Sequence, residues 1–371
     1  MAFRAVAMKW SWKIGRIAGI DVLMHVTFLL ILGWVGLKYY LPRQSLVDAL
    51  YGLIFISVLF FIVILHELGH ALTARRFGIA TRDITLLPIG GVARLERMPE
   101  DPRQELLVAL AGPAVNVALA AGVFVFLGPT GSLAEPQNLQ MVGGNFLVKV
   151  FWVNIVLAIF NLIPAFPMDG GRVLRALLAL KMDYVRATEI AATTGQALAL
   201  VFGFVGLFYN PFLVFIALFV WMGAAGEASM VQMRTALRGI PVSHLMMTDF
   251  QTLSIHDSID HAVRHILAGF QQDFPVLDQG AVAGVLTRSR MMSALASQGQ
   301  SGSVADFMDR DFQTADPSEM AQTAFQRLQT CECRTLPVVR DGRLVGIVNS
   351  ENLGEFLLIQ KALHQHTRVG G

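Results

Sequence analysis

The stretch Ser57-Val-Leu-Phe-Phe-Ile-Val-Ile-Leu-His66-Glu67-Leu68-Gly69-His70 joins an apolar run directly to three ionisable side chains. Residues four apart share one face of a helix, so the imidazoles of His66 and His70 point the same way. Each ionisable side chain costs roughly 2.5–3.5 kcal/mol at the centre of a membrane, and such residues are functional candidates by default. This stretch therefore predicts a membrane-spanning helix that carries a functional site.

The composition of the 371-residue chain is that of a membrane protein. Hydrophobic residues make up 54% and charged residues 15%, whereas charged residues reach about 25% in typical soluble domains. The net charge of +2 argues against nucleic-acid binding. Two cysteines, Cys331 and Cys333, cannot form a disulfide framework.

Six apolar segments are candidates to cross the lipid bilayer, which takes about 20 residues each. They are residues 19–37, 50–75, 106–127, 148–165, 190–208 and 212–229. Lysine and arginine gather in the N-terminal arm and in the second and fourth loops, and Arg175 counts among those of the fourth loop. Such residues mark the cytoplasmic side. We therefore expect a membrane domain over residues 1–235, in the plasma membrane, with both termini cytoplasmic.

The two histidines predict a zinc site, because neutral imidazoles suit this ion and a catalytic zinc takes three protein ligands plus a water. His66 lies about 15 residues into an inward-running span, roughly 22 Å deep at 1.5 Å per residue. Asp169 follows Pro164 and Pro167 at the inner end of the fourth segment, at a matching depth. We expect Asp169 to be the third ligand. A turn residue before two glycines is the alternative.

Glu67 stands next to the first histidine, where it can reach a zinc-bound water. Bound zinc lowers the pKa of water toward roughly 7, and a carboxylate can take its proton and pass it to a leaving amine. The spacing His-Glu-x-x-His on a helix is a metalloprotease signature. We expect one zinc per chain, held by His66, His70 and Asp169, with Glu67 as general base. A pair of packed histidines without a metal is the alternative interpretation.

The chain after residue 235 repeats itself at a shift of 62 residues. Asp249-Phe-Gln-Thr252 recurs as Asp311-Phe-Gln-Thr314, and Phe274-Pro-Val-Leu277 aligns with Leu336-Pro-Val-Val339. Each copy predicts a helix, two short buried strands and a second helix. In the first copy the helix is expected at 259–269 and the strands at 274–277 and 283–286.

Three separated motifs resemble the site-2 protease family of intramembrane zinc metalloproteases. They are His66-Glu-Leu-Gly-His70, Ala111-Gly-Pro-Ala-Val-Asn116 and Asn161-Leu-Ile-Pro-Ala-Phe-Pro-Met-Asp-Gly-Gly171. The repeat resembles a tandem pair of cystathionine-β-synthase (CBS) domains, expected at 241–298 and 304–360. The resemblance implies a polytopic α-helical membrane domain of about six transmembrane helices followed by an α/β tandem CBS domain pair. It also implies cleavage of a transmembrane segment of another membrane protein, known as regulated intramembrane proteolysis.

Four further residues are expected to contact the substrate. Residues 85–94 resemble a membrane-associated hairpin of the family, and its edge around Gly90 and Gly91 suits an extended substrate strand. An ordinary turn is the alternative there. Asn116 and Asn161 are expected to bond the substrate backbone or to stabilise an oxyanion, with interhelical packing as the alternative.

The role of the CBS pair stays open at this point. CBS clefts often bind adenine nucleotides through an element that ends in an Asp, and 284–290 and 346–352 both lack that Asp. Thr287 is the best remaining candidate for a nucleotide contact. A regulatory, dimerising or substrate-docking role without a nucleotide is the other reading, and a homodimer through the CBS domains is one form of it.

A different class of protein also fits the composition, namely a non-enzymatic transporter or channel gated by CBS domains. It does not explain a metal-ligand pair beside a general base, nor an aspartate at matching depth. A third reading keeps the protease and gives it the removal of signal-peptide remnants. Only the substrate distinguishes that task from signalling.

Overall fold

The computed structural model describes residues 10–42, 44–88, 90–96, 98–99, 101–128, 145–269, 271–330, 335–356 and 358–359. The chain divides into two units, Met1–Val231 and Gln232–Gly371. The two cysteines, Cys331 and Cys333, lie outside the described residues.

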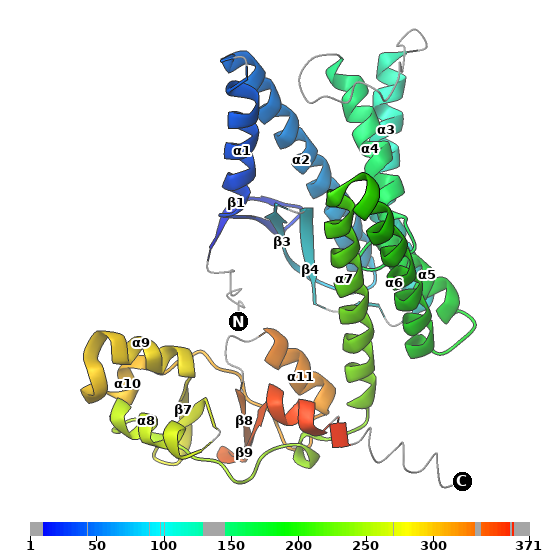
Figure 1. Cartoon of the computed structure of the whole chain (residues 1–371). Helices are drawn as coiled ribbons and strands as arrows, with labels where there is room; N and C mark the ends of the chain where they lie inside the picture. The colour runs from blue at the N-terminus through cyan, green and yellow to red at the C-terminus, as the bar shows by residue number, and fades with distance from the viewer. Residues whose placement is uncertain are drawn as a thin grey trace. The chain divides into compact units, whose positions relative to one another are not determined.

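The first unit contains seven helices within its described residues. They are α1 (Phe28–Tyr40), α2 (Leu46–Arg76), α3 (Pro102–Leu127), α4 (Phe146–Asn161), α5 (Asp169–Ala179), α6 (Tyr184–Tyr209) and α7 (Pro211–Ala236). Four of these, α2, α3, α6 and α7, are long and apolar enough to cross a membrane, and α1 and α4 are shorter apolar helices. Helix α1 packs beside α2, and α3 packs beside α4 (Figure 1). The expectation of a membrane domain with several apolar helices is confirmed, and the count of six spans stays a prediction.

Two of the expected spans have different bounds in the structure. The first was expected at 19–37, but Ile20–His25 is a strand and α1 begins only at Phe28. The fourth was expected at 148–165, but α4 ends at Asn161. Proline cannot donate a backbone N–H and clashes with the preceding turn, so Pro164 and Pro167 keep the helix from continuing. A separate helix, α5, then starts at the predicted ligand Asp169.

A four-stranded sheet packs against α2 in the first unit (Figure 1). Its strands are β1 (Ser11–Ile17), β2 (Ile20–His25), β3 (Thr81–Leu87) and β4 (Gly90–Leu95), in the order β1-β2-β3-β4. Strands β2 and β3 are parallel, and the other pairs are antiparallel. Ile84 of β3 is fully buried in a cluster with Phe60 and Ile64 of α2. The stacking holds β4, an edge strand of this sheet, against the helix that carries the two histidines.

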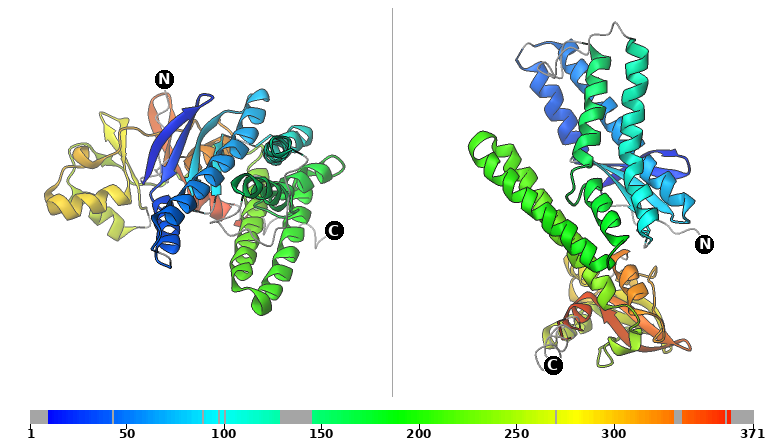
Figure 2. Two further views of the ribbon diagram at one scale, coloured as in Figure 1. Left: turned by 90° about the horizontal axis from the view of Figure 1, so that it is seen from above. Right: turned by 90° about the vertical axis from the view of Figure 1, so that its right-hand side faces the viewer.

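The second unit contains the two predicted copies. The first copy has β5 (Leu253–Ser254), α8 (Ile259–Ala268), β6 (Phe274–Asp278), β7 (Ala281–Leu286) and α9 (Arg288–Gln298); the second has α10 (Val304–Phe307), α11 (Ala321–Thr330), β8 (Thr335–Arg340) and β9 (Arg343–Asn349). The helix and the two strands predicted for the first copy are confirmed. Figure 2 shows this unit from two further sides. In the first copy Phe274 and Val276 of β6 are buried in one cluster with Ile259 of α8, so this strand is short and buried as predicted.

The buried strand β8 provides a test of the core of the second copy. Leu336 in β8 is fully buried, whereas Leu267 on α8 is 81% exposed. Leu336→Ala leaves a cavity, so we expect it to lower the free energy of unfolding of the second unit by about 2–5 kcal/mol. Leu267→Ala is the matched control and should change it by less than about 0.5 kcal/mol. Hydrogen exchange of the β8 and β9 amides in the full-length protein measures both. Equal exchange in the two variants would contradict the buried position of β8.

Candidate metal centre

Three side chains from two helices converge in the interior of the first unit. His66 and His70 lie one turn apart on α2, and Asp169 is the first residue of α5. The Nε2 atoms of the two histidines lie 3.1 Å apart, and each lies 3.1 Å from Oδ2 of Asp169. All three residues are buried. The structure therefore brings together the three residues that the sequence analysis predicts as zinc ligands.

The convergent atoms fit a zinc ion. Donors of a tetrahedral zinc at about 2.0–2.1 Å from the metal lie about 3.3 Å from one another, close to the 3.1 Å observed here. Gly112 of α3 keeps the space beside them open. A Cβ at Gly112 would come within 2.6 Å of Nε2 of His66 and would overlap Nε2 of His70. Two imidazoles, one carboxylate and a glycine-lined space make a donor set suited to zinc.

Helix α3 also holds the far side of both imidazole rings. Nδ1 of His66 lies 2.7 Å from Oδ1 of Asn116, and Nδ1 of His70 lies 2.7 Å from the carbonyl oxygen of Val108. Both partners are hydrogen-bond acceptors, so each Nδ1 donates its hydrogen and each Nε2 keeps a lone pair toward Asp169. Such second-layer partners orient the ligands of a metal site. Asn116 was expected to contact substrate, and the structure gives it this contact with a histidine ring.

Glu67 contacts the sheet rather than the three convergent ligands. Its Oε2 accepts a hydrogen bond of 3.2 Å from the backbone N–H of Ala93 in β4. A Cβ at Gly91 would lie 2.9 Å from Cγ of Glu67, so only glycine lets β4 approach the helix so closely. Gly90 begins the strand at a φ of +140°, a conformation that L-residues other than glycine rarely adopt. The glycine pair thus brings the edge strand to the predicted general base.

The remaining predicted site residue of the membrane unit stands apart from this cluster. The Asn161 side chain donates to the carbonyl oxygen of Leu157 in its own helix at 3.0 Å. The structure therefore does not bring Asn161 to the metal ligands by a hydrogen bond within the described residues. Its expected contact with substrate stays a prediction.

Two glycines fix the start of α5 and with it the position of Asp169. A Cβ at Gly170 would overlap the backbone of Leu162 and Ile163, and one at Gly171 would lie 2.6 Å from the backbone nitrogen of Phe166. The segment after α4 therefore folds directly against the first turn of α5. Aspartate also suits this position, because negative charge is favourable in the first turn of a helix.

One charged group was misassigned from the sequence. Arg175 was counted as a cytoplasmic loop residue, but it lies in α5 and is fully buried. Its guanidinium pairs with the carboxylates of Glu105 in α3 and Glu227 in α7. The signal that could have identified it is the glutamate in the first turn of an otherwise apolar helix, which needs a partner when buried.

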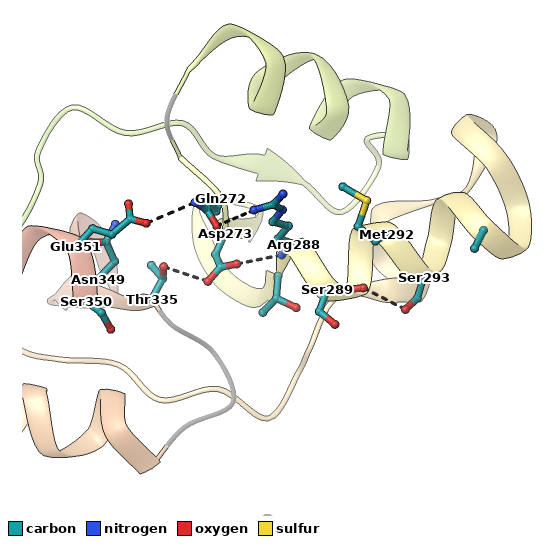
Figure 3. Close-up of a pocket in the computed structure, with 12 residues that line it drawn as sticks. Gln272, Asp273, Arg288, Ser289, Met292, Ser293, Thr335, Asn349, Ser350 and Glu351 are labelled. Carbon is teal, nitrogen blue, oxygen red and sulfur yellow. Dashed lines mark hydrogen bonds between the residues drawn. The ribbon is translucent and has the colours of Figure 1, made fainter. Parts of the chain in front are cut away.

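The second unit contains a cavity of about 810 Å³ that both copies of the repeat line. Asp273 of the first copy accepts hydrogen bonds from the backbone N–H of Arg288 at 3.0 Å and from the Thr335 hydroxyl of the second copy at 3.3 Å (Figure 3). Thr287, the expected nucleotide contact, lines this cavity, and its hydroxyl caps α9 by accepting from the N–H of Arg290.

Arg290 occupies the position at which the usual nucleotide-binding element has its Asp. It forms an ion pair with Asp309, with Nη2 and Oδ1 2.7 Å apart. A cation engaged in this way does not provide the acceptor that ribose hydroxyls need. The position that would carry this acceptor is therefore occupied by a cation paired with Asp309.

Comparisons with known proteins cover both units. The profile of peptidase family M50 matches residues 54–202, and the CBS domain profile matches 242–297 and 304–358. A zinc metalloprotease of Methanocaldococcus jannaschii is 30% identical over 93% of this chain and 96% of its own. Rip3 of Mycobacterium tuberculosis, provisionally named a zinc metalloprotease, is 30% identical over 94% of this chain and 93% of its own.

A solved structure of a site-2 protease from Methanocaldococcus jannaschii is also similar to the membrane unit. It is 36% identical to this chain, covers 59% of this chain and 95% of its own, and has a TM-score of 0.43. The Methanocaldococcus jannaschii zinc metalloprotease is 30% identical over nearly the full length of both chains, and this similarity decides the classification. The chain therefore belongs to peptidase family M50, the site-2 proteases, and carries a tandem pair of CBS domains after its membrane unit.

Proposed function

We propose that this protein is an intramembrane zinc endopeptidase that cleaves a transmembrane segment of a membrane-protein substrate. The observation that carries the proposal is the triangle of His66, His70 and Asp169 donor atoms, 3.1 Å on each side and buried among apolar helices. Burying three such groups is costly unless they bind something. A CBS-gated transporter or channel would not need this arrangement.

In the proposed mechanism the chain's own groups hold the metal and move one proton. A zinc ion bound by the three ligands would lower the pKa of a coordinated water toward roughly 7 and polarise the scissile carbonyl. Asn116 and the Val108 carbonyl keep the Nδ1 protons in place, so that both Nε2 atoms remain ligands. Glu67 accepts the proton of the attacking water and delivers it to the leaving nitrogen.

The edge of β4 is the proposed binding place for the substrate. A transmembrane helix hides its peptide carbonyls in its own hydrogen bonds, whereas an extended strand exposes them. Gly90 and Gly91 place this edge strand beside Glu67. The buried Nδ2 of Asn116 makes no hydrogen bond within the described part of the chain, and we assign it and Asn161 to the substrate backbone.

The proposed arrangement in the cell follows the charge pattern of the sequence. Six membrane segments of residues 1–235 cross the plasma membrane, α1 and α4 being the short ones, with both termini in the cytoplasm. CBS domains at 241–298 and 304–360 regulate the protease, and a homodimer through them fits this role. An adenine nucleotide in the cleft would contact Thr287, although the engaged Arg290 disfavours a ribose there.

Glu67→Gln tests the general base. The amide cannot take a proton, so we expect cleavage to fall by at least the 10²–10⁴-fold that general acid–base catalysis contributes, with unchanged folding and zinc content. Proteomics of membrane fragments from cells with either enzyme measures this and identifies a substrate that accumulates uncut in the variant. The exposed Glu355→Gln is the control. Full cleavage by Glu67→Gln would refute the assigned base.

The zinc content of ligand variants tests the metal centre. His70→Ala and Asp169→Ala should each lower zinc affinity by more than the 10–100-fold that loss of an outer partner costs. His265→Ala is a matched control, because His265 has the same four-residue spacing from His261 on α8. Metal analysis of the purified proteins decides, and stoichiometric zinc in both ligand variants would contradict the ligand set. Removal of zinc with a chelator should abolish cleavage, and added zinc should restore it.

Gly112→Ala tests the space beside the ligands. The new methyl group would occupy the position next to both Nε2 atoms, so we expect zinc affinity to fall at least 10-fold, as for other changes that displace ligands. Gly122→Ala on the same helix is the control, since a Cβ there meets no atom within 4 Å. Competition with a chelating dye measures the zinc affinity of both variants. Equal affinity would show that the metal site does not need the space left by Gly112.

A further inference from the structure

A buried ion-pair cluster lies six residues along α5 from Asp169, outside the metal centre. Nε of Arg175 donates to Oε1 of Glu105 at 2.8 Å, and Nη2 bonds the same oxygen. Nη1 donates to Oε1 of Glu227 at 2.5 Å. The rings of Phe166 and Tyr184 lie 5.0 Å from the guanidinium carbon. Arg175 and Glu105 are at most 1% exposed, whereas the Glu227 side chain is 30% exposed, so the Arg175–Glu105 pair is the part shielded from water.

The cluster joins α5, which carries Asp169, to α3, which bonds the rings of both histidines. Glu105 lies in the first turn of α3, and Val108, Gly112 and Asn116 follow it at intervals of three, four and four residues. Residues so spaced lie on one face of a helix. Along that face, Glu105 bonds Arg175 and the Val108 carbonyl bonds the ring of His70. Gly112 leaves space for the metal, and Asn116 bonds the ring of His66.

The position of Asp169 depends on how α5 lies against this face of α3. Asp169 is the first residue of α5, and the Arg175 guanidinium is anchored about 9 Å further along the axis at 1.5 Å per residue. Since α2 and α5 are separate elements, the contacts between α5 and its neighbours decide whether Oδ2 lies 3.1 Å from both Nε2 atoms. A shift of about 1 Å is large against the tolerance of a preorganised site.

Stability alone does not explain this cluster. Taking a charged pair out of water costs several kcal/mol per ion, and a well-packed apolar replacement of a buried pair is often as stable or more stable. What an arginine adds is direction, because its planar, forked donors fix the partner's position in a way that a lysine does not. Arg175 is buried between α5, which carries Asp169, and α3, which bonds both histidine rings. It is therefore suited to fix the position of one helix against the other.

We infer that Arg175 is a positioning residue of the metal centre, which holds α5 against α3 through Glu105 and so sets the distance of Asp169 from the two histidines. The inference rests on the ligand set of the proposed function. It assigns no contact between Arg175 and the metal or the substrate.

The test measures zinc affinity of the purified full-length protein by competition with a chelating dye, together with its thermal unfolding. Arg175→Lys keeps the charge and loses the fork, so zinc affinity should fall about 10–100-fold, as for other outer partners of metal ligands. The double variant Arg175→Met/Glu105→Met replaces the buried pair by apolar side chains, and Glu227, which also loses Arg175, has a side chain that is 30% exposed to water. This variant should unfold close to the wild-type temperature and yet lose at least as much zinc affinity as Arg175→Lys.

Two further variants make the outcome unambiguous. Arg94→Lys is the matched control, because Arg94 forms a forked ion pair with the buried Asp83 in the sheet, and it should keep wild-type zinc affinity. Asp169→Ala is the reference for loss of a ligand. Wild-type zinc affinity in the folded double variant, with Asp169→Ala impaired, would overturn the positioning role alone. Wild-type affinity in Asp169→Ala would overturn the ligand set and the inference with it.

Discussion

Two imidazole nitrogens and one carboxylate oxygen that meet within 3.1 Å of one another are the constraint on which the membrane unit depends. In water such groups would be solvated separately, and in an apolar interior they are costly unless each has a partner. The neighbouring residues of α3 provide these partners. Carbonyl acceptors bind the two Nδ1 atoms, and a missing side chain at Gly112 leaves the space that the donors share.

Close approach of backbones recurs around this site, and glycine makes each approach feasible. Gly69 of α2 lets α3 come so near that a Cβ would lie 2.8 Å from the carbonyl oxygen of Ala111, and Gly91 does the same for β4 against Glu67. Gly170 and Gly171 admit the segment that precedes α5. Elements that are distant in sequence thus make tight contacts around the candidate metal centre. The glycines allow these contacts because they have no side chain that would hold the backbones apart.

The metal-ligand cluster could be predicted from local spacing in the sequence, whereas strand β2 and the burial of Arg175 depend on contacts with distant residues. The spacing of His66 and His70 on one helix face and the two prolines before Asp169 are local features, and they predicted the three residues that the structure brings together. Residues 20–25 are a short, mostly apolar run that fits a helix or a strand equally well. Pairing with β1 on one side and with β3, some 60 residues away, on the other makes them the inner strand β2. Arg175 was misassigned for the same reason, since its partner Glu105 lies 70 residues earlier.

Helix α7 connects the cluster around Arg175 to the second unit through the chain itself. It is one unbroken run of 26 residues that carries Glu227, and its final turn already belongs to the second unit. The helix that continues into the second unit therefore carries a carboxylate that pairs with the same guanidinium that bonds α3. Because α7 is continuous, a rotation of its last turn would move the Glu227 carboxylate that pairs with Arg175, and Arg175 lies six residues along α5 from Asp169.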